Sequence, residues 1–330
     1  MTDTLAVITG DGMTGMLSGC SVMDGVLVVN KEAGWTSHDV VAKVRHLLGG
    51  LKVGHAGTLD PAATGLLPLL IGKGTRIAEY LMEWDKEYRA VLRLGETTDT
   101  QDATGTVLDR QATEEVTPAA IHKAVQEFCG AIDQIPPMYS AVKVEGVPLY
   151  RSARAGKMID RKARAVVIHE LEVLAIDGRD VTLRVICSKG TYIRTLCADI
   201  GAALGVGGHL LSLERRRVGP LTLDRALTID DLVTRQAIGR LGGELLSLDQ
   251  VLQDLPALAV DEQTASRVCH GVPVPLCKML PQSQAHEKVQ ISPGKPVRIH
   301  GDGGGLLAIG RLPQEGNATI AIEKVLVSQP

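Results

Sequence analysis

The sequence predicts an α+β fold, in which a large domain of strands and helices is followed by a small β-barrel. The apolar run 26–31 has the length of a buried strand, and residues 38–48 place apolar side chains on one face of a helix. Residues 88–94 alternate as strands do, and 181–190 form another strand-like run. From residue 256 onward, short apolar runs broken by glycine and proline indicate the barrel. The 330 residues suffice for two such domains.

The remaining elements follow from capping residues and helix breakers. Thr36 or Ser37 can cap the helix at 38–48, and residues 74–81 form a short second helix. Thr117 and Pro118 open a helix that ends near residue 130. Residues 230–252 read as a helical connection to the barrel, whose strands are expected at 289–291, 296–299, 306–310 and 320–326.

The N-terminal residues contain a pattern that could mislead. Residues 10–15 fit G-x-G-x-x-G, the dinucleotide-binding fingerprint, which is meaningful only when a helix follows within a βαβ unit. The next residues are too few and too rich in glycine for that helix. We therefore interpret residues 1–22 as a flexible extension or as the result of a start codon assigned too early.

Composition excludes several classes of protein. The six cysteines form no C-x-x-C pair and lie in no secretory context, which argues against a zinc site and a disulfide framework. No apolar stretch approaches the roughly 20 residues that span a bilayer, and the N-terminus lacks the basic region of a signal peptide. We expect a cytoplasmic protein with no membrane association.

The net charge of −3 gives no sign of nucleic-acid binding, but basic residues gather locally. Seven basic residues face only two acidic ones between Lys143 and Arg164, and Arg215 opens a run of three arginines. Such stretches can neutralise phosphates, although a solvated surface is the more common explanation. The candidates for contact with an RNA backbone are Lys143, Arg151, Arg154 and Arg215.

Asp60 lies in the stretch from which chemistry is most readily inferred. Residues 54–76 read GHAGTLDPAATGLLPLLIGKGTR, whose glycines and prolines prevent a regular helix. Pro61 restricts Asp60 to extended or turn conformations, so its carboxylate sits on a loop that leads into an apolar strand. The simpler alternative is that Asp60 only caps its own turn. A phosphate-binding P-loop is excluded, because Gly74 stands where that motif needs a hydroxyl residue.

A second acidic loop, at residues 95–105, offers Asp99 and Asp102. A divalent cation is conceivable there, but no third ligand has suitable spacing, so we expect a turn held by its own side chains.

Three motifs together resemble the bacterial tRNA pseudouridine-55 synthase family (TruB type). They are the Asp60 stretch, KGTYIRTL at 189–196 and HLLSLERRRVGP at 209–220. The resemblance implies a pseudouridine synthase fold at 23–252, with a central mixed, largely antiparallel sheet flanked by helices. It also implies an RNA-gripping insertion at about 134–165 and a PUA-like RNA-binding barrel at 253–330. The chain departs from the family pattern at Asn30, Glu32 and Glu214, which replace an aspartate, a proline and an arginine.

The same resemblance assigns roles to single residues. Asp60 is the catalytic carboxylate and Arg194 is its partner. Tyr88 lies against the target base, with a stacking or proton-transfer role. The remaining residues bind substrate: His55 fills the space that a flipped base leaves, while Tyr192 and Leu213 line the base pocket.

The implied reaction converts the T-loop uridine at tRNA position 55 to pseudouridine without a cofactor or metal. The implied partner is the tRNA T-arm, and we expect a monomer that needs no protein partner. Three alternatives stay open: a non-catalytic RNA-binding or RNA-folding protein on the same scaffold, a nucleotide-cofactor enzyme using residues 10–15, and a guide-RNA-dependent relative.

Overall fold

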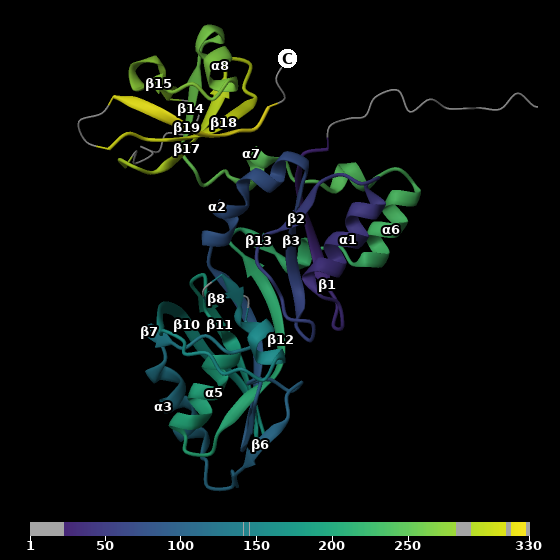
Figure 1. Ribbon diagram of the computed structural model, residues 1–330, viewed down its shortest axis with the longest axis vertical. Helices are drawn as coiled ribbons and strands as arrows, with labels where there is room; N and C mark the ends of the chain where they lie inside the picture. The colour runs from purple at the N-terminus through teal and green to yellow at the C-terminus, as the bar shows by residue number, and fades with distance from the viewer. Residues whose placement is uncertain (1–22, 141, 145, 282–291, 315–317, 328–330) are drawn as a thin grey trace, which may run out of the picture.

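The computed structural model describes residues 23–140, 142–144, 146–281, 292–314 and 318–327. Two sheets organise this part of the chain along one long axis, a large one in the lower and middle part of Figure 1 and a smaller one at the top. Residues 1–22, the segment with the G-x-G-x-x-G pattern, lie outside the described residues.

The large sheet has nine strands in the order β1-β3-β12-β4-β11-β10-β7, with β2 on β3 and β13 on β12. Only β3 and β12 run parallel, which confirms the predicted mixed, largely antiparallel sheet. The strands are β1 (Gly25–Lys31), β2 (Val53–His55), β3 (Thr64–Ile71), β4 (Lys86–Leu94), β7 (Gly130–Gln134), β10 (Arg164–Asp177), β11 (Asp180–Cys187), β12 (Gly208–Val218) and β13 (Leu221–Thr222).

Helices cover the two ends of this sheet separately. The α1 helix (Ser37–Leu47) and α6 (Ile229–Ala237) pack at the β1–β3 end, where Val40, Val44 and Leu232 are buried. The α3 helix (Pro118–Glu127) and α5 (Ile193–Ala203) pack over the β4–β10 end in a separate core. A two-stranded hairpin, β5 (Glu96–Thr98) with β6 (Val107–Arg110), leads from β4 toward α3.

Most of the predicted elements are confirmed, with some corrections. Thr36 caps α1 and forms a reciprocal capping box with Asp39, and Thr117 caps α3. The expected helix at 74–81 begins as a 3₁₀ helix, Gly72–Ile77, and becomes α-helical only in α2 (Ala78–Glu83). Residues 230–252 are helical as expected, in α6, a 3₁₀ turn (Leu241–Glu244) and α7 (Leu248–Val251).

The smaller sheet has the strand order β15-β19-β18-β17-β14-β16, and α8 (Glu262–Cys269) packs against it. Its strands are β14 (Ala257–Val260), β15 (Val274–Pro275), β16 (Leu280–Pro281), β17 (Pro296–Gly301), β18 (Leu306–Arg311) and β19 (Thr319–Val325). The strands predicted at 296–299, 306–310 and 320–326 are confirmed, whereas 289–291 lie outside the described residues. Within the described residues the end strands β15 and β16 do not pair, so closure of the predicted β-barrel stays a prediction.

The two sheets meet through buried contacts. Ile309 of β18 and Leu326, which follows β19, share a core cluster with Leu81 and Leu248. Asp249 adds polar contacts, because Arg298 Nη1 lies 2.7 Å and His300 Nε2 2.8 Å from its carboxylate. The smaller sheet is therefore anchored to the helices that border the large one.

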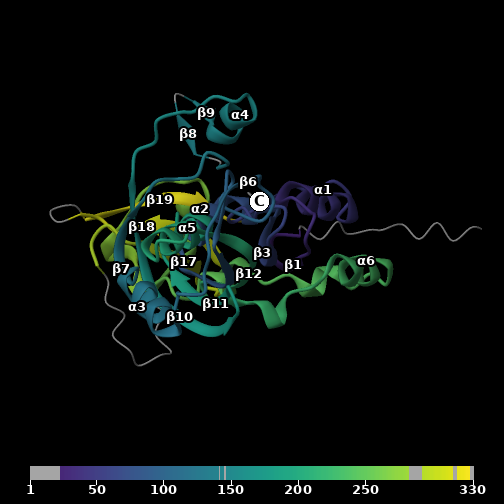
Figure 2. The ribbon, with the colours of Figure 1, turned by 90° about the horizontal axis from the view of Figure 1, so that it is seen from below.

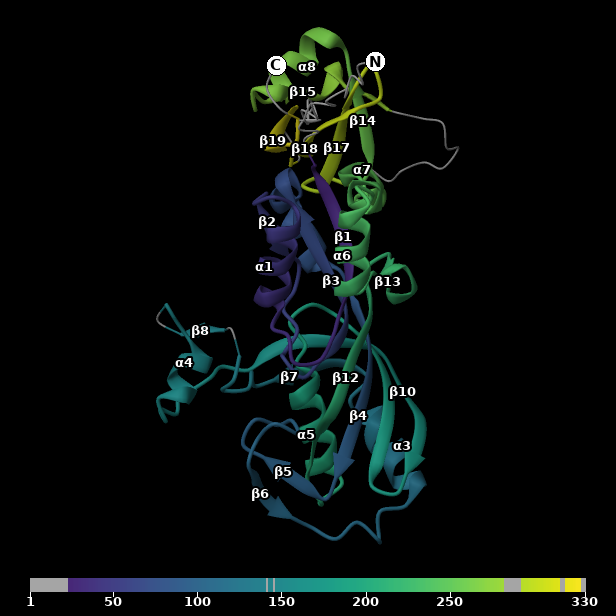
Figure 3. The same ribbon diagram turned by 90° about the vertical axis from the view of Figure 1, so that its right-hand side faces the viewer.

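The basic stretch forms a small lobe that stands away from the large sheet in two perpendicular views (Figures 2 and 3). Its elements are β8 (Lys143–Val144), β9 (Val147–Pro148) and α4 (Leu149–Arg154).

None of the helices in the described ranges is long and apolar enough to cross a membrane.

Candidate active site

Asp60 lies on the loop between β2 and β3, as predicted. Gly57 (φ 103°) and Gly65 (φ 100°) bend the backbone on either side of it in a conformation that side chains disfavour. Ser37 holds the loop from α1, because its Oγ accepts a hydrogen bond from Leu59 N at 2.9 Å. The aspartate thus occupies a fixed backbone position on a rigid scaffold.

Lys31, a buried lysine, holds the same loop from β1. Its ammonium donates to the carbonyl oxygens of Glu32, Trp35 and Pro61 at 2.9, 2.7 and 3.2 Å. Burial lowers the pKa of Lys31 to about 8, although the charge of Asp60 opposes this shift. The family resemblance gives Lys31 no role. The signal in the sequence is a lysine at the end of a buried, mostly apolar strand.

Arg194 pairs with Asp60 as predicted. Its Nε lies 3.0 Å from Asp60 Oδ2 and its Nη2 donates to Oδ1 at 3.3 Å, so the planar guanidinium meets both carboxylate oxygens. Arg194 also donates to the carbonyl oxygens of Thr100 (3.3 Å) and Tyr139 (2.9 Å), and a second carboxylate, Asp102, lies 3.8 Å away. The arginine side chain is 6% exposed and the aspartate 42%, so the carboxylate faces outward from a buried partner.

Two opposing effects act on the charge of Asp60. Burial raises the pKa of the carboxyl above its usual value, and Asp102 adds to the rise, while Arg194 and Lys31 oppose it. The net effect is a raised pKa for Asp60. The Arg194 guanidinium therefore reduces the penalty for ionising this carboxyl but does not reverse it.

The Asp99–Asp102 loop is held by its own hydrogen bonds, as predicted. Asp102 Oδ1 accepts from the Thr100 and Thr104 hydroxyls at 2.7 and 2.6 Å, and Asp99 Oδ1 accepts from Thr106 N at 2.7 Å. Asp102 also faces Arg194, so this loop forms part of the site.

Tyr88 and Leu213 come to the site from neighbouring strands. In the β4–β12 register, Tyr88 lies opposite Arg215 and Ala90 lies opposite Leu213, so all four side chains share one face. Tyr88 and Leu213 are both half-buried against the α3–α5 core. Burial raises the pKa of Tyr88, and the charge of Asp60 contributes to the rise, which is consistent with a position near the carboxylate.

Tyr192 is fixed through its backbone just before α5. Gln134 binds it twice, accepting from Tyr192 N at 2.9 Å and donating to Tyr192 O at 3.2 Å. Its side chain is half-buried. The family resemblance gives Gln134 no role either.

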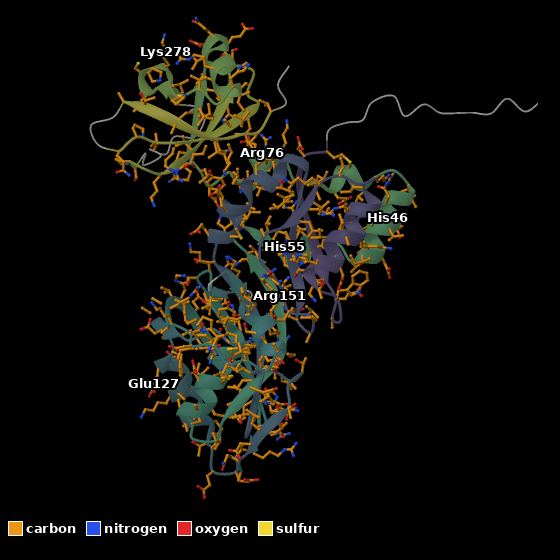
Figure 4. The ribbon with its side chains drawn as sticks, viewed as in Figure 1. His46, His55, Arg76, Glu127, Arg151 and Lys278 are labelled. Carbon is orange, nitrogen blue, oxygen red and sulfur yellow. The ribbon has the colours of Figure 1, made fainter. Side chains whose placement is uncertain are left out.

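His55 ends β2 and is half-buried near the middle of the molecule (Figure 4). Its ring meets that of His38 edge to face, with centroids 5.5 Å apart. Burial lowers the pKa of His55, and the nearby charges of His38 and Arg215 act in the same direction. The imidazole therefore favours its neutral form.

The prediction that Arg215 contacts an RNA backbone is contradicted by its burial. Only 1% of the residue is exposed, and its guanidinium donates to the carbonyl oxygens of Leu66 and Gly57 at 2.7 and 3.0 Å. The strand places Arg215 on the inner face, whereas Arg216 is exposed. The three arginines look equivalent in the sequence. Only their place in a strand, where successive side chains point to opposite faces, distinguishes the buried Arg215 from the exposed Arg216.

The other three basic candidates lie in the small lobe. Lys143 falls in β8, and Arg151 and Arg154 fall in α4. Arg151 is exposed. Their contact with RNA stays a prediction.

Family comparisons agree with this arrangement. Residues 45–193 match the model "TruB family pseudouridylate synthase (N terminal domain)", and residues 194–258 match "tRNA pseudouridylate synthase B C-terminal domain". The chain is 48% identical to the tRNA pseudouridine synthase B of Ralstonia pickettii, over 78% of this chain and 82% of that protein. It is 43% identical to the protein of the same name from Burkholderia lata, over 93% of this chain and 91% of the relative.

Solved structures extend the likeness to the fold. The chain resembles one in a Cbf5-Nop10-Gar1 complex, with a TM-score of 0.73 and 30% identity over 93% of this chain and 86% of the other. A chain of an H/ACA RNP bound to a substrate RNA containing 2'-deoxyuridine gives a TM-score of 0.71 at 28% identity, over 93% and 86%. Fold and motifs together define a pseudouridylate synthase. Within that class, the chain belongs to the TruB family.

Proposed function

We propose that this protein converts the T-loop uridine at tRNA position 55 to pseudouridine, with Asp60 as the catalytic carboxylate. The observation that supports this most is the ion pair of Asp60 with Arg194, 3.0 Å long, on a partly exposed loop next to Tyr88. The names of the bacterial relatives, tRNA pseudouridine synthase B, support tRNA as the substrate.

The reaction is an isomerisation in which atoms balance without a co-reactant. The bond between uracil N1 and the ribose C1′ breaks, the uracil turns, and a bond forms between C5 and C1′. The proton on C5 must leave and N1 must gain one. The target base is stacked in a folded loop, so it has to be flipped out to reach Asp60. His55 would fill the vacated space, and Tyr88, Tyr192 and Leu213 would hold the base.

The domains take separate parts in this proposal. Residues 23–252 form the catalytic domain, and the lobe within 134–165 grips the RNA backbone through Lys143, Arg151 and Arg154. Residues 253–330 act as a PUA-like RNA-binding domain, consistent with the six-stranded sheet. We propose that the protein acts on tRNA in the cytoplasm, as a monomer that needs no protein partner.

The direct test is incubation of the purified protein with an unmodified tRNA transcript, followed by base-resolved detection of pseudouridine. We expect conversion at position 55 alone, without a guide RNA or added cofactor. A transcript with cytidine at that position is the matched control and should gain no pseudouridine. Conversion that requires a guide RNA would favour the guide-dependent alternative, and no conversion with intact tRNA binding would favour the non-catalytic one.

A further inference from the structure

Arg215 is a buried cation placed between the catalytic loop and Tyr88. Its Nε donates to Leu66 O and its Nη2 to Gly57 O, and these carbonyls flank the Asp60 loop on its two sides. Gly65 packs onto the backbone of the same residue, since a Cβ there would lie 2.3 Å from Arg215 O. One side chain thus fixes both ends of the loop that carries the carboxylate.

Arg215 and Tyr88 lie directly opposite each other in the β12–β4 register, and the charge of Arg215 acts on the Tyr88 hydroxyl. A guanidinium has only donors, so in a hydrogen bond between the two groups the Tyr88 oxygen is the acceptor. The single proton of the hydroxyl would then point away from Arg215 and be free for another acceptor in the pocket.

No acidic side chain pairs with Arg215 among the described residues, unlike Arg194. An unpaired charge in the interior is costly, and its two carbonyl acceptors offset only part of that cost. The buried charge also acts on its surroundings: it opposes the rise that burial causes in the pKa of Tyr88. Such an arrangement is more readily explained by a role in the site than by stability alone.

We propose that Arg215 is a positioning residue for the isomerisation, which holds the Asp60 loop at both ends and orients the Tyr88 hydroxyl so that its proton faces the bound uracil. This inference rests on the proposed function and adds a residue that acts through Tyr88 rather than by touching RNA. The hydroxyl can then donate to a uracil carbonyl or nitrogen while Arg215 occupies its oxygen.

The test is a double-mutant cycle of Arg215→Lys and Tyr88→Phe, measured as single-turnover conversion of a tRNA transcript. The lysine keeps a positive charge and can still reach a loop carbonyl, but it lacks the fork that also reaches Tyr88. We expect Arg215→Lys to slow conversion by about 10- to 100-fold, as small misplacements in active sites do. In the Tyr88→Phe background the same change should cost much less, because the shared contact is already lost.

A matched control is Arg93→Lys, which makes the same chemical change at the other end of β4. Arg93 pairs with Asp180 at 2.7 Å, remote from Asp60 in the strand register. We expect both lysine variants to shift the thermal unfolding midpoint and to leave tRNA affinity unchanged, whereas only Arg215→Lys slows conversion beyond what instability explains.

Three results would overturn the inference while wild-type protein remains active. They are additive effects in the cycle, a loss of rate in Arg215→Lys no larger than in Arg93→Lys, and a loss of tRNA affinity that accounts for the slower rate. The second comparison holds even if Tyr88→Phe is too slow to measure. If Arg215→Lys does not fold, Arg215→Gln is compared with Arg93→Gln in the same way. An inactive wild-type protein would instead count against the proposed function.

Discussion

At Asp60, the surroundings that raise the pKa of the carboxyl also contain the cation that limits the rise. Burial makes ionisation harder, and Arg194 makes it easier by offering two donors to the charged form. The carboxylate must be ionised to act in the proposed reaction. The pH dependence of the rate is therefore the property in which this balance should be visible.

Replacing Arg194 by glutamine should move the acid limb of the kcat/KM profile to higher pH. The wild-type limb is expected above the usual pKa of an aspartate, because the pKa of Asp60 is raised. Removing the opposing cation raises that pKa further, so activity is lost earlier as the pH falls. Measuring kcat/KM against pH for both proteins gives the position of the acid limb. An acid limb that stays in place or moves to lower pH in the Arg194→Gln variant would show that Arg194 does not lower the pKa of Asp60.

Replacing Lys31 by methionine should destabilise the protein and reduce its activity. Its ammonium serves three carbonyl oxygens around the Asp60 loop, and a buried polar group left unpaired costs about 1–3 kcal/mol. Denaturant unfolding gives the stability, and single-turnover conversion gives the rate. The exposed Lys52 serves as the control, since Lys52→Met should leave both the free energy of unfolding and the conversion rate unchanged. An unchanged free energy of unfolding in Lys31→Met would show that Lys31 does not stabilise the Asp60 loop.

How far the sequence predicts single residues depends on what fixes each one. The resemblance placed Asp60 opposite Arg194 because both lie in long, specific motifs. It could not place Lys31, Gln134 or Arg215, whose roles come from hydrogen bonds to backbone carbonyls distant in sequence. Such carbonyls leave no mark in composition or spacing.

Among the elements, the parallel contact of β3 with β12 brings the two halves of the site together. It pairs Thr64 with Glu214 and Gly65 with Arg215, just after the Asp60 loop. The β12–β4 pairing then adds Tyr88. Three segments far apart in the sequence therefore converge where a single short parallel contact forms.

Gly65→Ala should be strongly destabilising for this reason. The backbone there has φ 100°, and the new Cβ would lie 2.3 Å from Arg215 O. Strain and overlap together should lower the free energy of unfolding by about 2–5 kcal/mol. Gly178→Ala is the matched control, because Gly178 also has positive φ but nothing within 4 Å, and it should cost about 1 kcal/mol. Equal losses in the two variants would be inconsistent with this packing.

The sequence predicted the individual elements better than their pairing. Periodicity and caps gave β1, α1, β4, α3 and β11 close to their observed bounds, since these signals are local. The long strand β10 was not predicted, because its half-exposed face mixes charged and apolar residues. The β12 strand was recognised only as a motif, since its arginine run masks the alternation.

Charge is unevenly distributed over the whole molecule. The net charge is −3, yet the projecting lobe lies in a stretch with seven basic residues against two acidic ones. A basic lobe on an acidic body would attract a polyanion to the lobe rather than bind it over the whole surface. Affinity for tRNA should therefore weaken steeply with salt.

Arg151→Ala should weaken tRNA binding and lower the salt dependence of the affinity by about one ion, while the rate at saturating tRNA stays close to wild type. Arg151 is exposed on α4, and no ion pair to it is found within the described residues. Filter binding across a salt series measures the slope. The exposed Arg240, which follows α6, is the control and should alter neither quantity when changed to alanine. An unchanged slope for Arg151→Ala would remove this residue from the RNA contact.

In the proposed reaction, the Asp60 carboxylate, held by Arg194, carries out the isomerisation. Asp60→Asn keeps the size of the side chain and removes its charge, so tRNA binding and folding should be preserved. The decisive measurement is base-resolved pseudouridine at tRNA position 55 after prolonged incubation with wild-type and Asp60→Asn proteins. We expect full conversion by the wild type and none by the variant, at unchanged tRNA affinity. Conversion by Asp60→Asn at a rate near that of the wild type would rule out Asp60 as the catalytic carboxylate.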